Sequence, residues 1–206
     1  MRIIKITFLF VITLILSNCA SGYKKINPKS INYISMNESD GVKFEYKYDL
    51  LDKKYEKKEI KKGVKLITVK ITNNSGKDLM FGRNIKIAYE NGKEVYIMDS
   101  EKVFKTLKQS PASYLWYLLL TPVNLYTTET SSNGFRQETS STPIGLVLGP
   151  GIAGGNMIVA GSANKKFKEE ISEYNVNGII IKDSETKYGL IGIKTDSFDA
   201  LKLKVE

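Results

Sequence analysis

The sequence predicts an α+β protein, mainly β: an antiparallel β-sandwich of about seven strands that carries a helical insertion. Three observations lead to this prediction. Segments in which apolar and polar residues alternate occur in two blocks, at 42–98 and 178–205. Turn-forming residues separate these segments. Between the blocks, residues 100–174 lose the alternation and take apolar spacings typical of helices.

The first block opens with the clearest strand, over Val42–Leu51. Val42, Phe44 and Tyr46 lie on one face and charged residues alternate with them, which is typical of a half-buried strand. Residues 52–63 are rich in lysine and glutamate and are predicted to form a solvated loop. Further strands are predicted at 64–72, 79–89 and 94–98, with a type I′ hairpin turn at Asn91-Gly92.

The insertion starts with a short helix predicted over 100–109. Ser110-Pro111 suits the first positions of a second helix, which runs to Pro122. Residues 124–141 read as a polar loop, and Thr142-Pro143 repeats the helix-start pattern. We expect the helices to pack as an antiparallel pair onto the sandwich. The last one presents Ala163, Phe167, Ile171 and Tyr174 on one face, before strands return at 178–182, 188–194 and 201–205.

The N-terminus has the features of a signal peptide. Arg2 and Lys5 precede an apolar run over 6–16, which is too short to span a bilayer as a helix. Leu16-Ser17-Asn18-Cys19 then resembles the lipobox of bacterial lipoproteins, with Asn18 where Gly, Ala or Ser is usual. The resemblance implies cleavage before Cys19, diacylglycerol on its sulfur and fatty acylation, such as palmitate, of the new amine.

Ordinary secretion is the alternative, with cleavage at Ala20-Ser21-Gly22. Lipidation is favoured because the single cysteine of the chain falls at the lipobox position. The predicted organisation is a signal peptide at 1–18, a lipidated tether at 19–41 and a folded domain at 42–206. By resemblance to known sorting, Ala20 in place of Asp favours the outer membrane of the cell envelope over the inner membrane.

Composition excludes several classes of function. The chain of 206 residues has no histidine, so histidine-based catalysis and histidine metal sites are excluded. Acylation would use the only thiol. The net charge of +9 invites a nucleic-acid partner, but arginine occurs only at 2, 83 and 136. We therefore expect a non-enzymatic protein without a metal, a cofactor or a nucleic-acid partner.

One motif points elsewhere. Residues 149–154, Gly-Pro-Gly-Ile-Ala-Gly, match the G-x-G-x-x-G pattern of dinucleotide-binding proteins, and an apolar run precedes them. The rest of the chain has no further βαβ pattern. Dinucleotide binding through 149–154 is therefore kept as a remote alternative.

Two stretches, 109–128 and 139–164, contain no charged residue. The glycine pairs Gly145/Gly149 and Gly151/Gly155 have the spacing that allows two helices to approach closely. The stretches are either a helical hairpin buried within the fold or a hairpin over 109–164 that inserts into a membrane or a partner. Burial is favoured because prolines interrupt both stretches and the second contains two asparagines.

The arrangement as a whole resembles the immunoglobulin-like domains of many uncharacterised envelope lipoproteins. That likeness is architectural and implies no activity. We expect a membrane-anchored envelope lipoprotein that acts as a non-catalytic binding or scaffolding module. Its expected partners are membrane lipid, through acylated Cys19, and another envelope protein or a glycan.

Overall fold

The computed structural model describes residues 19–130, 134 and 136–206. The chain divides into two compact units. Residues 23–108 and 164–206 form the first, called here the sheet unit; residues 109–163 and the N-terminal segment, described from Cys19 to Gly22, form the second, called the hairpin unit. The predicted signal peptide at 1–18 lies outside the described residues. The insertion predicted at 100–174 is therefore divided between the two units. Residues 109–163 belong to the hairpin unit, and the two ends, 100–108 and 164–174, belong to the sheet unit.

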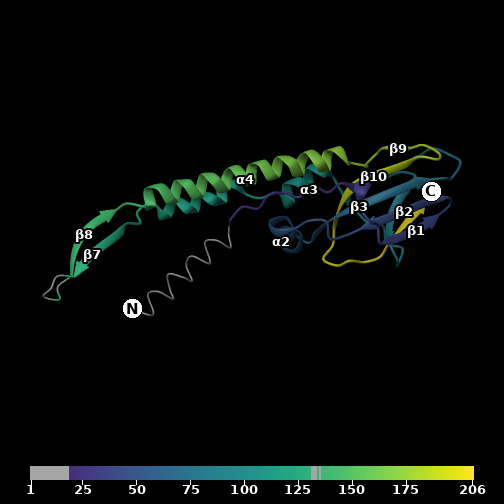
Figure 1. Ribbon diagram of the computed structural model, residues 1–206. Coiled ribbons are helices and arrows are strands. Elements are labelled where there is room, and N and C mark those ends of the chain that lie inside the picture. The colour runs from purple at the N-terminus through teal and green to yellow at the C-terminus, as the bar shows by residue number, and fades with distance from the viewer. Residues whose placement is uncertain (1–18, 131–133, 135) are drawn as a thin grey trace. The chain divides into compact units, whose positions relative to one another are not determined.

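Antiparallel strands dominate the sheet unit (Figure 1), which confirms a mixed α+β class. One sheet has five strands in the order β1-β2-β3-β10-β6, and two further pairs are β11-β5 and β4-β9. The bounds are β1 Ser35–Ser39, β2 Val42–Lys47, β3 Val64–Asn73, β4 Leu79–Met80, β5 Ile85–Tyr89, β6 Ile97–Met98, β9 Ile180–Ile181, β10 Thr186–Lys194 and β11 Leu201–Val205.

The core of the sheet unit lies between these sheets. Val42, Phe44 and Tyr46 on β2 are buried as the alternation predicts, and they join one apolar cluster with Ile71 of β3 and Ile87 of β5. The strand register explains why Phe44 and Ile71 join the same cluster, because they lie opposite each other in the β2–β3 pairing. All three sheets contribute side chains to this cluster.

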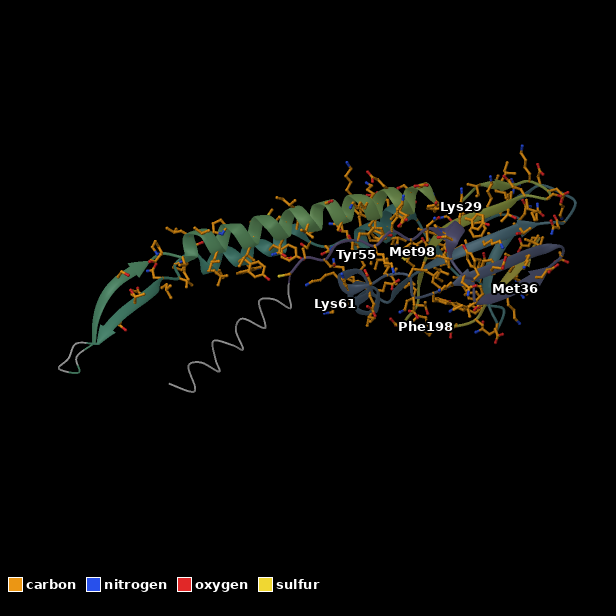
Figure 2. The ribbon with its side chains drawn as sticks, viewed as in Figure 1. Lys29, Met36, Tyr55, Lys61, Met98 and Phe198 are labelled. Atoms are coloured by element: carbon orange, nitrogen blue, oxygen red, sulfur yellow. The ribbon has the colours of Figure 1, made fainter. Side chains whose placement is uncertain are left out.

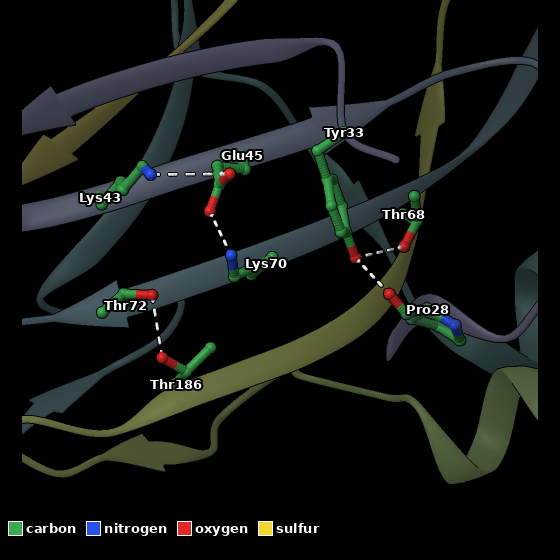
Figure 3. Close-up of polar contacts among 8 residues, drawn as sticks. All are labelled: Pro28, Tyr33, Lys43, Glu45, Thr68, Lys70, Thr72 and Thr186. Atoms are coloured by element: carbon green, nitrogen blue, oxygen red, sulfur yellow. Dashed lines mark hydrogen bonds and ion pairs between the residues drawn. The ribbon is translucent and has the colours of Figure 1, made fainter. Parts of the chain in front are cut away.

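Polar contacts hold the other face of the five-stranded sheet (Figure 3). The Glu45 carboxylate lies 2.7 Å from Lys70 Nζ and 3.7 Å from Lys43 Nζ. The Tyr33 hydroxyl donates to the Pro28 carbonyl oxygen at 2.8 Å and lies 3.1 Å from Thr68 Oγ1. Of these contacts, the Glu45–Lys70 ion pair joins β2 to β3, and partly exposed ion pairs of this kind contribute little to stability.

The predicted hairpin at Asn91-Gly92 forms, but its turn is of another type. Gly92 has φ 82°, whereas Asn91 is not among the described residues with positive φ, so the turn is not type I′. The Gly92 N–H donates to the Tyr89 carbonyl oxygen at 2.9 Å. After a single bridge at Glu94 the chain leaves β5, and β6 pairs with β10 instead.

The loop predicted over 52–63 is wrong, because Lys53–Lys62 forms helix α2. Tyr55 and Glu59, one turn apart, are buried, and Gly63 ends the helix in the left-handed conformation with φ 58°. Lysine and glutamate are good helix formers, so charge alone did not indicate a loop here.

Residues 19–41, predicted as a tether, instead take part in the fold. Pro28–Ser30 forms the 3-10 turn η1, and Ser35–Ser39 forms the edge strand β1. Ile26 is buried, and its N–H donates to both carboxylate oxygens of Glu170 at 2.9 Å. Spacing within the segment gave no sign of these partners, which lie more than a hundred residues away.

Helices cover part of the sheet unit. The predicted helix at 100–109 is α3, Ser100–Leu107, and the Asp99 carboxylate caps it by accepting the Glu101 N–H at 2.8 Å. The end of helix α4, Gly145–Glu173, buries Phe167 against the rings of Tyr23, Tyr55 and Phe104. Of these residues, Tyr55 is labelled in Figure 2. This amphipathic segment therefore packs on α2, α3 and the N-terminal segment, where we had expected the sheet.

The hairpin unit consists of a 3-10 helix, η2 Pro111–Leu120, a strand pair and the first part of α4. The polar loop predicted at 124–141 is wrong, because β7 Leu125–Thr130 and β8 Arg136–Thr142 form an antiparallel hairpin. Helix α4 continues through Pro150, one of the prolines that interrupt the uncharged stretches. Pro150 leaves one helical hydrogen bond unmade but does not end the helix.

Candidate functional site

Helices η2 and α4 of the hairpin unit run side by side (Figure 1). They are antiparallel and approach closely at two glycines. A Cβ atom on Gly145 would collide with the Leu120 and Thr121 carbonyl oxygens, and one on Gly149 would lie 2.8 Å from Thr121 Oγ1. The Gly145 N–H donates to the Val123 carbonyl oxygen at 2.8 Å. The predicted antiparallel pair and the role of Gly145/Gly149 are confirmed within this unit.

The second glycine pair does not have this role. A Cβ atom on Gly151 or Gly155 would meet nothing within 4 Å, and the same is true of Gly154 and Gly161. The prediction that Gly151/Gly155 also serves close helix approach is therefore wrong. Four-residue spacing places both pairs along α4, but only one of them faces η2.

Large apolar side chains cover the outside of this unit. They come from η2, from the segment after it and from α4, and none of the stretches that carry them contains a charge. Single exposed apolar residues are ordinary in soluble proteins, whereas many large ones gathered on one small unit mark an interaction surface. We call this set the apolar surface: Leu115, Trp116, Leu118, Leu119, Val123, Leu125, Tyr126, Leu146, Val147, Leu148, Ile158 and Val159.

The distribution of side chains around α4 indicates which surroundings the apolar surface suits. Only a narrow stripe that includes Gly145, Gly149 and Ala153 is buried, and the other sides carry apolar or small residues as far as Ala163. A helix lying flat on a membrane needs a polar face, which this segment does not have. A helix that is apolar all round is normally surrounded by protein or lipid.

Length and composition agree with this description. Among the described residues, α4 alone is long and apolar enough to cross a membrane, and 22% of its most apolar window is buried within the structure. The core helix of a soluble protein passes the same test but is mostly buried. The preference for burial of 109–164 within the fold therefore has little support from the observed exposure.

Cys19, the predicted lipidation residue, lies in the same unit. The Ala20 N–H donates to Asn156 Oδ1 at 2.5 Å, and Ser21 pairs with Gln109 through two hydrogen bonds of 3.1 and 2.7 Å. Gln109 is buried, and Cys19 shares a side-chain hydrogen bond with Tyr117. The chain that follows Cys19 is thus fastened to the base of η2 and to α4.

Sequence reasoning did not find Gln109 and Asn156. Each is a polar residue within or at the edge of an uncharged stretch, and that was the available signal. Asn156 counted against membrane contact when read alone. The structure gives its amide two partners, because Nδ2 also donates to the Ile152 carbonyl oxygen at 2.8 Å.

The glycine motif at 149–154 does not form a phosphate-binding loop. Its residues lie inside α4, where backbone N–H groups point along the helix, and the apolar run before it is helical too. A dinucleotide site needs these glycines in a turn between a strand and the start of a helix. The remote alternative of dinucleotide binding is therefore contradicted.

Other candidate groups have structural partners. Glu170 is 1% exposed and accepts the Tyr23 hydroxyl at 2.5 Å besides the Ile26 N–H, so it fastens the N-terminal segment. Burial, followed by the bond to Glu170, raises the pKa of Tyr23. In the part of the chain that the structure describes, no cluster of three or more acidic, Cys or His residues is placed to hold a metal ion.

A surface cleft of about 530 Å³ in the sheet unit is the other candidate. Phe81, Arg83, Lys86 and Tyr96 are among its lining residues. The Lys86 ammonium lies 2.9 Å from a Glu206 carboxylate oxygen, so one of the two cations is already paired. The cleft offers a basic and aromatic lining without an arrangement that indicates a particular ligand.

Comparison of the chain with protein-family models, with curated proteins and with solved structures gives no match.

Proposed function

We propose that this chain is a lipid-anchored protein of the bacterial cell envelope whose hairpin unit makes a second, apolar contact with the membrane. Acylated Cys19 is the covalent anchor, and the outer membrane is the proposed location. The sheet unit, for which we propose an immunoglobulin-like sandwich, acts as a non-catalytic binding or scaffolding module for another envelope protein or a glycan.

The apolar surface is the observation that carries this proposal. Each Leu, Ile or Val gains about 1.5–3 kcal/mol when it is transferred fully from water to an apolar environment. Keeping such a set exposed is costly unless lipid or a partner covers it. The docked position of residues 19–22 favours lipid, because it brings the proposed anchor to the unit that carries the surface.

Vesicle flotation tests the proposal without the covalent lipid. The chain used begins at residue 19 and carries Cys19→Ser, and we expect it to float with phosphatidylethanolamine–phosphatidylglycerol vesicles. Leu119→Lys with Val147→Lys places two charges in the apolar surface. Since a charge at the bilayer centre costs about 2.5–3.5 kcal/mol, we expect at least about a 100-fold weaker partition into vesicles.

The matched control is Ile34→Lys with Tyr96→Lys. Both residues are exposed on the sheet unit, so this variant gains the same charge and keeps the apolar surface. It should float like the parent chain. A parent chain that remains monomeric in the aqueous fraction would overturn the proposal, and so would equal losses in the two double variants.

A further inference from the structure

The structure assigns a depth to the hairpin unit, an inference that rests on the proposed function. We infer that Cys19, Trp116 and Tyr117 lie at the membrane interface. Beyond that level, η2 from Leu118 and α4 from Asn156 back to Gly145 lie within hydrocarbon. The partner is the bilayer itself, contacted on the side that holds the acyl chains of Cys19.

Three kinds of residue meet at the proposed interface. The docked segment brings Cys19 to Tyr117, whose ring stacks on Tyr114 with centroids 6.4 Å apart. Trp116 is adjacent in η2 and 74% exposed. Tyr and Trp concentrate at the level of lipid headgroups, because their rings are apolar and their N–H or O–H groups reach water. The amides of Gln109 and Asn156 belong to the same region, through their bonds to Ser21 and Ala20.

The direction into lipid follows from the antiparallel packing. Gly149 lies against Tyr117 and Thr121, and Gly145 lies against Leu120 and Val123. Moving along α4 from Asn156 to Gly145 therefore leads away from Cys19 and towards β7 and β8. The large exposed side chains along this path are all apolar, among them Leu119 and Val147.

The uncharged length matches the thickness of a bilayer core. The helix from Gly145 to Asn156 rises about 16 Å, and the uncharged parts of the strands, 125–128 and 139–142, extend the arm to about 30 Å. The hydrocarbon core is about 30 Å thick. The Thr127 and Ser140 hydroxyls bond to each other at 2.6 Å, which partly satisfies them away from water.

The single tryptophan of the chain allows a direct test of depth. The lipidated protein is reconstituted into vesicles whose acyl chains carry bromine either near the headgroup or near the bilayer centre. The parent chain reports from Trp116. A second chain, Trp116→Phe with Val147→Trp, reports from α4, where Val147 is 74% exposed and a larger ring has room. A control, Trp116→Phe with Tyr96→Trp, reports from the sheet unit.

We expect the shallow bromines to quench Trp116 at least twofold more than the deep ones, with the reverse order for the tryptophan at 147. The control should not be quenched. If Trp116 is quenched more by the deep bromines, or 147 more by the shallow ones, the depth is wrong while the membrane contact stands. If neither is quenched although the protein stays with the vesicles, hairpin contact with lipid fails, and the inference fails with it.

Discussion

At the scale of single residues, burial and charge conflict most strongly at Glu59. Its side chain is 3% exposed on α2, and one oxygen accepts the Leu66 N–H at 2.6 Å. Burial raises the pKa of this carboxyl to about 7, and the bond from Leu66 offsets only part of the effect. Glu59 therefore joins α2 to β3, and the free energy needed to keep its carboxylate buried depends on pH.

The sign of this dependence follows from linkage. In the unfolded chain Glu59 releases its proton near pH 4.5, whereas in the folded chain it does so near pH 7. Between these values the folded state holds the extra proton, so its contribution to stability falls as pH rises from about 4.5 to about 7. Glu59→Gln keeps an oxygen acceptor for Leu66 and cannot ionise.

We therefore expect Glu59→Gln to gain about 1–3 kcal/mol of stability relative to the parent between pH 5 and pH 8. Urea unfolding followed by circular dichroism at both pH values measures this change. Glu56→Gln, on the exposed side of the same helix, is the control and should follow the parent. A parallel pH dependence of the Glu59 variant and the parent would contradict the assignment.

At the scale of elements, α4 has two parts with different surroundings. Residues 145–163 belong to the hairpin unit and carry no charge, and residues 164–173 belong to the sheet unit and bury Phe167 and Ile171. The change occurs at Asn164, where the Tyr55 hydroxyl donates to the side-chain oxygen at 3.1 Å. One continuous helix thus presents an apolar circumference along one part and an amphipathic pattern along the other.

The glycines of α4 give a prediction with opposite signs at two positions. Alanine at Gly145 would place its Cβ against backbone oxygens of η2, which cannot move aside without separating the pair. Alanine at Gly155 has open space and gains up to about 1 kcal/mol of helix propensity. Hydrogen exchange of α4 amides in detergent micelles should be faster in Gly145→Ala and unchanged or slower in Gly155→Ala. Faster exchange in both variants would show that Gly155 has a neighbour as well.

At the scale of the whole molecule, the two units differ in what covers their apolar residues. The sheet unit encloses its own core, to which three antiparallel sheets contribute. The hairpin unit leaves most of its large apolar side chains uncovered. A self-contained module joined to an uncovered apolar hairpin is the division expected when one unit meets other molecules in water and the other meets the membrane.

Cys19 gives the prediction for this scale. In cells that express the full chain, a fatty-acid label should enter the parent protein and be absent from Cys19→Ser, which should accumulate as the unprocessed precursor. Ser17→Ala keeps the cysteine and serves as the control that remains labelled. An unlipidated mature protein that begins at Tyr23 would refute the lipobox assignment and support ordinary secretion.

The local pattern of apolar residues was sufficient to predict secondary structure where a segment's own sequence determined it. Val42–Lys47 and Leu201–Val205 alternate between apolar and polar residues, so any fold that buries one face makes them strands. The helix at Ser100–Leu107 followed from its apolar spacing. The segments at 53–62, 35–39 and 125–142 were missed because few of their residues are apolar, so they lack the apolar periodicity on which the predictions depended.

By itself, the sequence determined the antiparallel strand content, the uncharged stretches at 109–128 and 139–164, and the position of the only cysteine. Only the tertiary structure decided which glycines face η2, that residues 19–22 dock onto Gln109 and Asn156, and that the uncharged stretches remain exposed. The physical reason is that a residue's chemistry sets its preference for burial, whereas its actual burial depends on which other segments the fold brings against it.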